Sequence, residues 1–275
     1  MPRFEGKVAL ITGAASAVEG QLMGFGGCAA WRILREGGRV MIADIADDRG
    51  EQAVAQMRDA GLDATYVHLD VTREDDWSAA VDTSVARYGR LDILINVPGA
   101  SDRGSILNTD EDTWQTVMDV SSRGMFLGAK SVAQTMQESG GGAIVNVASM
   151  AARYGGQYGA AYSSSRAAIV AFGGSAAVQF APMGIRVNSV LPGWTHTPFT
   201  DQLFNDETAS TIRINRTPLK RWGEPEEIAA GNRAYEVMSC FPGRAVIFFL
   251  ETPTYPRGHV FLKDAEEVYT AAPCG

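Results

Sequence analysis

Residues 8–16 read Val8-Ala-Leu-Ile-Thr-Gly-Ala-Ala-Ser16, an apolar run of strand length that passes directly into a glycine-containing turn. Such a run, bounded by a turn residue, is typical of a buried β-strand. Similar runs alternate with amphipathic stretches of helix length along the chain, which is the pattern of βαβ units. The sequence therefore predicts an α/β fold, with helices flanking a doubly wound parallel sheet.

The alternation divides the chain into a regular series of elements. We predict strands over 8–12, 39–43, 64–68, 93–96, 143–147, 186–190 and 258–264, and helices over 26–36, 47–60, 73–88, 111–138, 162–181 and 224–239. No internal repeat or low-complexity linker interrupts the series, so we predict a single domain over 1–275. Pro242-Gly243 is a turn signal, which predicts a split or lengthened helix and an insertion around 231–244.

Residues 193–218 follow the end of a predicted strand and look irregular. In an open α/β sheet, an excursion at the carboxyl ends of the strands is where substrate is covered. We therefore predict a substrate lid over 193–218, with a surface loop as the alternative. Four aromatic residues are candidates either to line an apolar pocket under the lid or to pack its interior: Trp194, His196, Phe199 and Phe204.

Composition limits the classes of function. The chain has 275 residues, is 45% hydrophobic and carries a formal net charge of −8. This charge argues against a nucleic-acid partner. No apolar run reaches the ~18 residues of a membrane span, and the N-terminus lacks a signal-peptide core, so we expect a cytoplasmic protein with a small-molecule substrate. We expect neither a disulfide framework nor a metal site, because the cysteines and histidines are scattered: Cys28, Cys240, Cys274, His68, His196 and His259.

The segment from Ser149 to Arg166 contains the residues best suited to chemistry. Tyr162 follows Ser149 by thirteen positions and precedes Arg166 by four. On a helix, residues four apart lie on one face, so Tyr162 and Arg166 can reach a shared ligand. A strand that ends near Ser149 brings its hydroxyl beside the phenol. Because a fixed positive charge favours phenolate, Tyr162 is a candidate proton donor and acceptor.

This segment resembles the active site of the short-chain dehydrogenase/reductase family, in which Ser, Tyr and Lys stand at this spacing on a Rossmann-like sheet. The resemblance covers about residues 4–230. Arg166 stands where the family has lysine, and Ser121, within Val120-Ser-Ser-Arg-Gly124, stands where the family has an asparagine on the fourth helix. In the family these two positions belong to a proton path. Because a guanidinium cannot readily give up a proton, the resemblance implies that this path has changed.

The glycine-rich turn after the first strand departs from the family pattern, which is Thr-Gly, three residues, then Gly-x-Gly. Here Gly13 and Ser16 are followed by an insertion, residues 17–23, before Gly24-Phe25-Gly26. Such a turn lets backbone N–H groups approach a pyrophosphate at a helix N-terminus. The insertion brings in Glu19, which would repel a phosphate if it pointed inward.

The remaining cofactor positions of the family are better preserved. Asp44 closes the second strand, where an acidic side chain binds the adenosine ribose and repels a 2′-phosphate, so NAD is expected in preference to NADP. The other positions that match family motifs are Asp70, Val71, Asn96, Gly99, Pro192, Gly193 and Thr197. Each also has a plain structural alternative: Asp44 or Asp70 could cap a helix, and Thr197 could be a turn residue.

Three functional hypotheses follow. The first is an atypical NAD(H)-linked oxidoreductase that interconverts alcohols and ketones, with Tyr162 as acid and base. The second is a non-redox enzyme of the same fold that catalyses dehalogenation, elimination, isomerisation or cyclisation without nicotinamide. It resembles the halohydrin dehalogenases, which use Ser, Tyr and Arg at this spacing. The third is an inactive binding protein. The resemblance also implies a homodimer or homotetramer, and we expect a dimer through helices 111–138 and 162–181.

Overall fold

The computed structural model describes residues 2–97, 99–154, 159–217, 219–231, 245–248, 261–263 and 268–269. The helix change and insertion predicted around 231–244 lie outside these residues, except for Gly231. The same holds for the part of the predicted helix 224–239 that follows Gly231.

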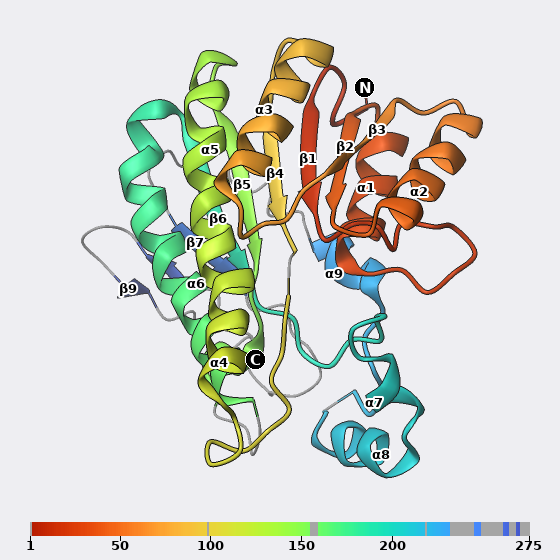
Figure 1. Cartoon of the computed structure of the whole chain (residues 1–275), viewed down its shortest axis with the longest axis vertical. Helices are drawn as coiled ribbons and strands as arrows, with labels where there is room; N and C mark the ends of the chain where they lie inside the picture. Colours follow the sequence, from red (N-terminus) through yellow and green to blue (C-terminus); the bar gives the residue numbers. More distant parts are fainter. Residues whose placement is uncertain are drawn as a thin grey trace.

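The described strands form one sheet (Figure 1). They are β1 (Val8–Thr12), β2 (Arg39–Asp44), β3 (Ala64–His68), β4 (Ile93–Asn96), β5 (Gly142–Val147), β6 (Ile185–Val190), β7 (Ala245–Phe248), β8 (Phe261–Lys263) and β9 (Val268–Tyr269). Their order is β3-β2-β1-β4-β5-β6-β7-β8-β9, parallel as far as β7 and antiparallel at β8 and β9. The order reverses between β1 and β4, which is the switch point where open α/β sheets bind ligands.

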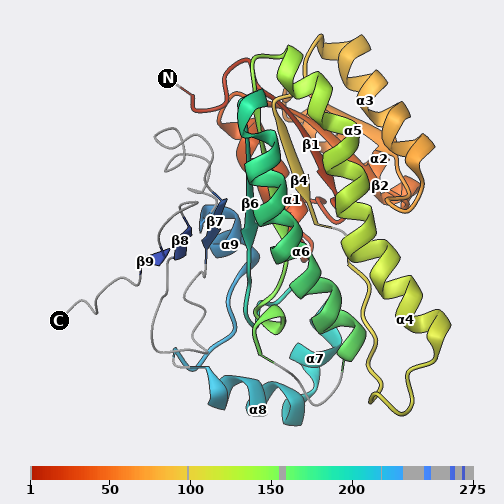
Figure 2. The ribbon, with the colours of Figure 1, turned by 90° about the vertical axis from the view of Figure 1, so that its left-hand side faces the viewer.

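Helices cover both faces of this sheet (Figure 2). The described helices are α1 (Phe25–Arg35), α2 (Asp47–Asp59), α3 (Glu74–Tyr88), α4 (Glu111–Met118), α5 (Gly124–Glu138), α6 (Ala160–Phe180), α7 (Asp201–Asn205), α8 (Glu207–Arg216) and α9 (Pro225–Gly231). One core packs α3, α5 and α6 on the sheet, and a second packs α1 and α2 on the opposite face. All five residues of β1 are buried, which explains its continuous apolar sequence: it is covered from both sides. The predicted doubly wound α/β fold is confirmed.

Three details differ from the sequence-based prediction. The helix predicted over 111–138 is interrupted by a π-helical segment, Asp119–Arg123, between α4 and α5. Residues 193–218 are not irregular, since they contain α7 and α8; Asp206 starts α8 by accepting a hydrogen bond from the Ala209 amide at 2.8 Å. Two further strands are present, because β7 and β9 lie outside the single strand predicted over 258–264, which contains β8.

Close packing of α5 on α3 depends on a glycine. The buried ring of Trp77 in α3 donates from Nε1 to the Val71 carbonyl at 3.0 Å. A Cβ added to Gly128 of α5 would lie 2.5 Å from this ring. Glycine is therefore needed here although it weakens a helix interior. Among the described helices, none is long and apolar enough to cross a bilayer.

Gly128→Ala and Gly174→Ala form a matched test of this packing. Alanine favours a helix interior over glycine by about 0.5–1 kcal/mol. A Cβ on Gly174 in α6 meets no atom within 4 Å, so we expect its replacement to raise the free energy of unfolding by about that amount. At Gly128 the collision with Trp77 costs about 1–3 kcal/mol and outweighs the gain. Urea unfolding measures both variants; equal stabilisation by both would contradict the packing.

Candidate active site

The predicted site residues gather at one edge of the sheet. Gly13, Asp44, Asp70, Gly99 and Ser149 each follow or close a parallel strand, β1 to β5 in turn. The carboxyl ends of parallel strands share one edge, so the fold brings these residues together although they are far apart in sequence. In Figures 1 and 2, α7 and α8 lie beyond this same edge.

Arg166 and Tyr162 contact each other on α6. The Arg166 Cζ atom lies 4.7 Å from the centroid of the Tyr162 ring. Arg166 is only 5% exposed, and its Nη1 donates to the carbonyl of Val147, the last residue of β5, at 3.0 Å. This bond turns the Tyr162 face of α6 toward the end of β5, where Ser149 follows. The predicted helical pairing of Tyr162 and Arg166 is therefore present in the structure.

Ser149 lies in a short turn at the end of β5. Its Oγ accepts a hydrogen bond from the Ala151 amide at 3.1 Å and caps the 3-10 turn Met150–Ala152. The Met150 amide donates to the Pro192 carbonyl at 3.0 Å, which joins this turn to the loop after β6. Ser149 is partly exposed and retains the donor capacity of its hydroxyl for a ligand.

Ser121 is in the middle of the π-helical segment and is fully buried. Its Oγ has no hydrogen-bond partner among the described residues. Short π-helical turns inside α-helices occur frequently at functional sites. The segment packs against α6, so Ser121 lies next to the helix that carries Tyr162.

Gly99 leaves room for the arginine. A Cβ at this position would lie 2.7 Å from Nη2 of Arg166, so a larger residue would displace the guanidinium. Asn96, at the end of β4, is fully buried and donates from Nδ2 to Oδ1 of Asn146 on β5 at 2.9 Å. Asn96 therefore connects neighbouring strands beneath the site.

In the turn between β1 and α1, glycines allow backbone groups to lie close together. Gly13 has a φ of 63° and donates its amide to the Ala43 carbonyl at 3.0 Å. A Cβ on Gly26 would lie 3.0 Å from the Gly13 carbonyl oxygen. Ser16 Oγ accepts from the Gly24 amide at 3.0 Å. The side chain of Phe25 packs against a core cluster of Val145, Val190 and Ile228, so only its backbone faces this turn.

Glu19, in the predicted insertion 17–23, is anchored away from this turn. The Glu19 carboxylate pairs with Arg35, the last residue of α1, and the Glu19 amide donates to Gln56 of α2 at 2.7 Å. At 1.5 Å per residue, Arg35 is about 15 Å along the helix from Phe25. Trp31 fixes the start of the insertion by donating to the Ala17 carbonyl at 2.8 Å. Glu19 is therefore drawn toward the C-terminal end of α1.

Asp44 is bound by backbone amides. Its Oδ2 accepts from Ala15 at 3.0 Å and its Oδ1 accepts from Ala46 at 3.2 Å. The carboxylate thus joins the glycine-rich turn to the turn after β2. Ala46, not Asp44, is the N-cap residue of α2, so the alternative interpretation of Asp44 as a helix cap is wrong.

Asp70 forms a tight turn with Thr72. Its Oδ1 accepts from the Thr72 amide at 2.9 Å and from the Thr72 hydroxyl at 2.7 Å. The backbone hydrogen bond from Thr72 is the main reason that the pKa of Asp70 is below its usual value. The N-cap of α3 is Arg73, so Asp70 does not cap that helix. Val71 is buried, and its carbonyl is occupied by Trp77.

Residues 193–218 have an aromatic interior. His196 stacks on Phe204 at 3.6 Å between ring centroids, and Trp222 contacts Phe204 at 5.5 Å and Trp194 at 5.8 Å. Phe199 has a different position: its ring stacks on Tyr162 at 6.2 Å with 26° between the planes. Two of the four candidate pocket aromatics, Trp194 and Phe204, therefore contact Trp222, His196 stacks on Phe204, and Phe199 alone contacts Tyr162.

Pro192, Gly193 and Thr197 surround the start of this segment. Thr197 is 4% exposed, and its amide donates to Thr200 Oγ1 at 3.0 Å. The Thr200 amide in turn donates to the Thr197 carbonyl at 2.9 Å, so Thr197 is a turn residue, as its structural alternative predicted. Gly193 accepts from Thr195 Oγ1 at 3.3 Å.

Sequence reasoning missed Asp102. This carboxylate is 4% exposed and accepts hydrogen bonds from the amides of Ala161 and Tyr162, at the start of α6. No local sequence signal identifies it, because its partners lie in a distant part of the chain. The residue was not among the predicted site residues.

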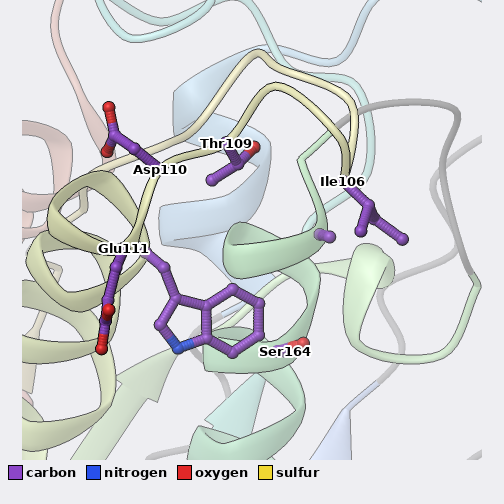
Figure 3. A pocket seen from close by; sticks show the side chains of 7 residues that line it. Ile106, Thr109, Asp110, Glu111 and Ser164 are labelled. Atoms are coloured by element: carbon purple, nitrogen blue, oxygen red, sulfur yellow. The ribbon is translucent and has the colours of Figure 1, made fainter.

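A cavity of about 480 Å³ lies beside the start of α6 (Figure 3). Its lining comes from the loop after β4 and from α4 and α6: Ile106, Thr109, Asp110, Glu111, Trp114, Ala160 and Ser164. None of the predicted site residues lines it, so it is separate from the reaction centre.

Comparison with known proteins assigns the family. Residues 20–232, more than three quarters of the chain, match the family described as enoyl-(acyl carrier protein) reductase. Cyclopentanol dehydrogenase of Comamonas testosteroni is 37% identical over 229 residues, which are 83% of this chain and 89% of that protein. The 3-alpha-(or 20-beta)-hydroxysteroid dehydrogenase of Mycobacterium tuberculosis is 37% identical over 227 residues, 82% of this chain and 81% of that protein. The chain therefore belongs to the short-chain dehydrogenase/reductase family.

Solved structures agree with this assignment. The gluconate 5-dehydrogenase of Burkholderia cenocepacia, in complex with NADP and tartrate, superposes with a TM-score of 0.80 at 27% identity, covering 89% of this chain and 94% of that chain. An NAD⁺-bound xylitol dehydrogenase superposes with a TM-score of 0.79 at 30% identity, covering 89% and 98%. The relatives support an oxidoreductase, and both nicotinamide cofactors occur among them.

Trp222→Ala tests the aromatic interior. Trp222 is 5% exposed, and truncating a buried tryptophan costs about 3–5 kcal/mol. We expect faster hydrogen exchange across α7 and α8, with β1 and β5 still protected. Leu219→Ala is the control, because Leu219 is 62% exposed in the same part of the chain and its truncation should change little. Uniform loss of protection over the sheet would contradict the interpretation that Trp222 stabilises α7 and α8 separately from the sheet.

Proposed function

We propose that this chain is an NAD(H)-linked dehydrogenase that interconverts secondary alcohols and ketones, with Tyr162 as the acid and base. The observation that carries the proposal is the Tyr162–Arg166 contact held against the end of β5, with Ser149 following that strand. The family relationship supports the same class of reaction.

The turn between β1 and α1 fits a dinucleotide. The first turn of α1 carries no acidic residue, and its N-cap Gly24 offers no side-chain oxygen to the free amides. The positive end of a helix with free N–H groups favours phosphate. Since Glu19 pairs with Arg35, its carboxylate is held back from this position. We propose that Gly13, Ser16, Gly24, Phe25 and Gly26 hold the pyrophosphate, mainly through the backbone.

We propose NAD in preference to NADP because of the charge at the ends of β2 and β3. Asp44 is held by two backbone amides at the end of β2, where its carboxylate would accept hydrogen bonds from ribose hydroxyls. Its negative charge would repel a 2′-phosphate. Asp70 and Val71 are proposed to border the adenine. Asn96, Gly99, Pro192, Gly193 and Thr197 are proposed to border the nicotinamide.

Three residues share the chemistry at the reaction centre. Tyr162 would give a proton to the carbonyl oxygen or take one from the alcohol, and Ser149 would hydrogen-bond the same oxygen. Arg166 would stabilise the phenolate and orient the ribose, because its charge is permanent and its donors are arranged as a fork. A bound nicotinamide would supply or accept the hydride.

The substrate is proposed to be an apolar, ring-containing secondary alcohol. Phe199 stacks on Tyr162 and is 47% exposed, so it offers an apolar wall beside the phenol. Two relatives are named for cyclopentanol and hydroxysteroid substrates, which share this chemistry. We further propose that 193–218 acts as the lid of one domain over 1–275, and that the protein is a cytoplasmic homodimer or homotetramer.

A non-redox reaction at Ser149, Tyr162 and Arg166 is the second candidate. It is favoured by the arginine, which is a poor proton relay, and by the buried Ser121 hydroxyl. A reaction with internal proton transfer does not need a path to solvent. The third hypothesis, an inactive binding protein, is less well supported, because Tyr162 keeps partial exposure.

Tyr162→Phe tests the proposed function. We expect turnover of an apolar cyclic alcohol with NAD to fall by about 10²–10⁴-fold, the range that positioned proton transfer contributes. Fluorescence titration with NADH and NADPH is the binding control, with NADH preferred and little change in the variant. Undiminished turnover would remove Tyr162 from the mechanism. Absence of NADH binding to the wild type at millimolar concentration would refute the dehydrogenase proposal.

Restoring the family residues tests the proton path. The double variant Arg166→Lys with Ser121→Asn should raise the rate of alcohol oxidation by about tenfold, because lysine can pass a proton that arginine retains. Lysine is also smaller where Gly99 contacts the guanidinium. Each single variant is a control, and we expect less gain from either. A folded double variant with no gain would count against the relay and in favour of the non-redox candidate.

A further inference from the structure

Helix α6 begins without a cap of its own. Its N-cap residue, Gly159, has a φ of 81° and forms no side-chain hydrogen bond to the first turn. The first turn contains no acidic residue. The first amides of an α-helix have no partner within the helix and need one from elsewhere. Tyr162 belongs to this first turn, so whatever satisfies these amides also fixes Tyr162.

Asp102 supplies the missing acceptors from the loop after β4. Its Oδ1 accepts from the Tyr162 amide at 2.9 Å, and its Oδ2 accepts from the Ala161 amide at 3.3 Å. Thr109 Oγ1 lies 3.4 Å from the same Oδ2. Main-chain bonds keep the loop in place, since the Gly159 amide donates to the Gly104 carbonyl at 3.2 Å.

The Asp102 carboxylate is buried, so groups of the protein must compensate its charge. Asp102 is 4% exposed, so solvent does not screen it as it screens a surface charge. A buried ionised group needs hydrogen bonds or opposite charge, and the amide bonds of α6 meet that need. The positive end of the helix dipole adds to the attraction.

We propose that Asp102 is a positioning residue for the reaction centre, whose buried carboxylate binds the first turn of α6 and sets the position of Tyr162. This role rests on the proposed function of Tyr162 as acid and base. The Arg166 guanidinium contacts the Tyr162 ring from one side, and the bonds of Asp102 hold the Tyr162 backbone.

No other charged group described near Tyr162 forms the hydrogen bond that Asp102 accepts from the Tyr162 amide. The described charged or titratable residues on α6, on the neighbouring loops and on α7 include Arg166, Arg103, Arg153, His196 and Asp201. The α4 helix and the π-helical segment also pack against α6, and they carry Glu111, Asp112, Asp119 and Arg123. Arg103 is bonded to Gln202, and His196 Nε2 lies 2.9 Å from Asp201 Oδ1. Among these groups, Asp102 alone hydrogen-bonds the Tyr162 amide.

Asp102→Asn tests the proposal, because it removes the charge at nearly constant volume. We expect kcat to fall about tenfold or more, as small misplacement of a reacting group is costly, with little change in the KM for NAD. A purely structural cap would lower stability but leave the kcat of the folded variant unchanged.

A spectroscopic measurement separates this proposal from the proposed function. In protein with ¹³C-labelled tyrosine rings, the Tyr162 resonance, assigned with Tyr162→Phe, should change its chemical shift in Asp102→Asn, because the ring moves relative to Arg166 and Phe199. This readout does not require turnover. Asp110→Asn is the matched control: Asp110 caps α4 through the Thr113 amide at 2.7 Å and is exposed, so neither kcat nor the Tyr162 chemical shift should change.

Two results would overturn the proposal. One is a folded, active Asp102→Asn protein with the kcat and the Tyr162 chemical shift of the wild type. The other needs only the wild type and so holds if the variant does not fold: unprotected Ala161 and Tyr162 amides in hydrogen exchange would show that the carboxylate does not bind them. If the wild type lacks dehydrogenase activity but the Tyr162 chemical shift changes in Asp102→Asn, the proposed function fails and the role of Asp102 remains.

Discussion

A hydrogen bond from a buried guanidinium to the end of a strand holds the site together. Arg166 Nη1 donates to the Val147 carbonyl and joins α6 to β5 at the edge of the sheet where ligands are expected. A buried charge is costly unless it is hydrogen-bonded or paired, so this position of the guanidinium is strongly defined. The Tyr162 ring packs on the same group. The orientation of the whole reaction helix therefore depends on this contact.

Several neighbouring segments lie against Arg166 or against the helix that carries it. Gly99 has no side chain where Nη2 approaches, and the π-helical segment brings Ser121 against α6. Asp102 binds the first turn of the same helix. The proposed lid, 193–218, contacts Tyr162 through Phe199, while Trp194 and Phe204 contact Trp222. The residue of this segment that faces Tyr162 is therefore separate from the residues that form its aromatic interior.

Much of the fold was predictable from local sequence. The first six strands agree with the prediction to within one residue at either end, because short apolar runs in a parallel sheet are buried on both faces. The lid helices were missed because their sequence is polar and their stability comes from aromatic packing. The π-helical segment was missed because one extra residue in a turn hardly alters the apolar period. Asp102 was missed because its partners are distant in sequence.

The sequence by itself determined the α/β class, the order of the first elements and the spacing of Ser149, Tyr162 and Arg166, because strand and helix periods are local properties of the chain. Only the tertiary structure decided which way the insertion 17–23 turns, since Arg35 and Gln56 lie on other elements. It also decided that Asp44 binds backbone amides and that Asp102 caps α6. These outcomes depend on which loops meet at one edge of the sheet, and that is fixed only when the strands pair.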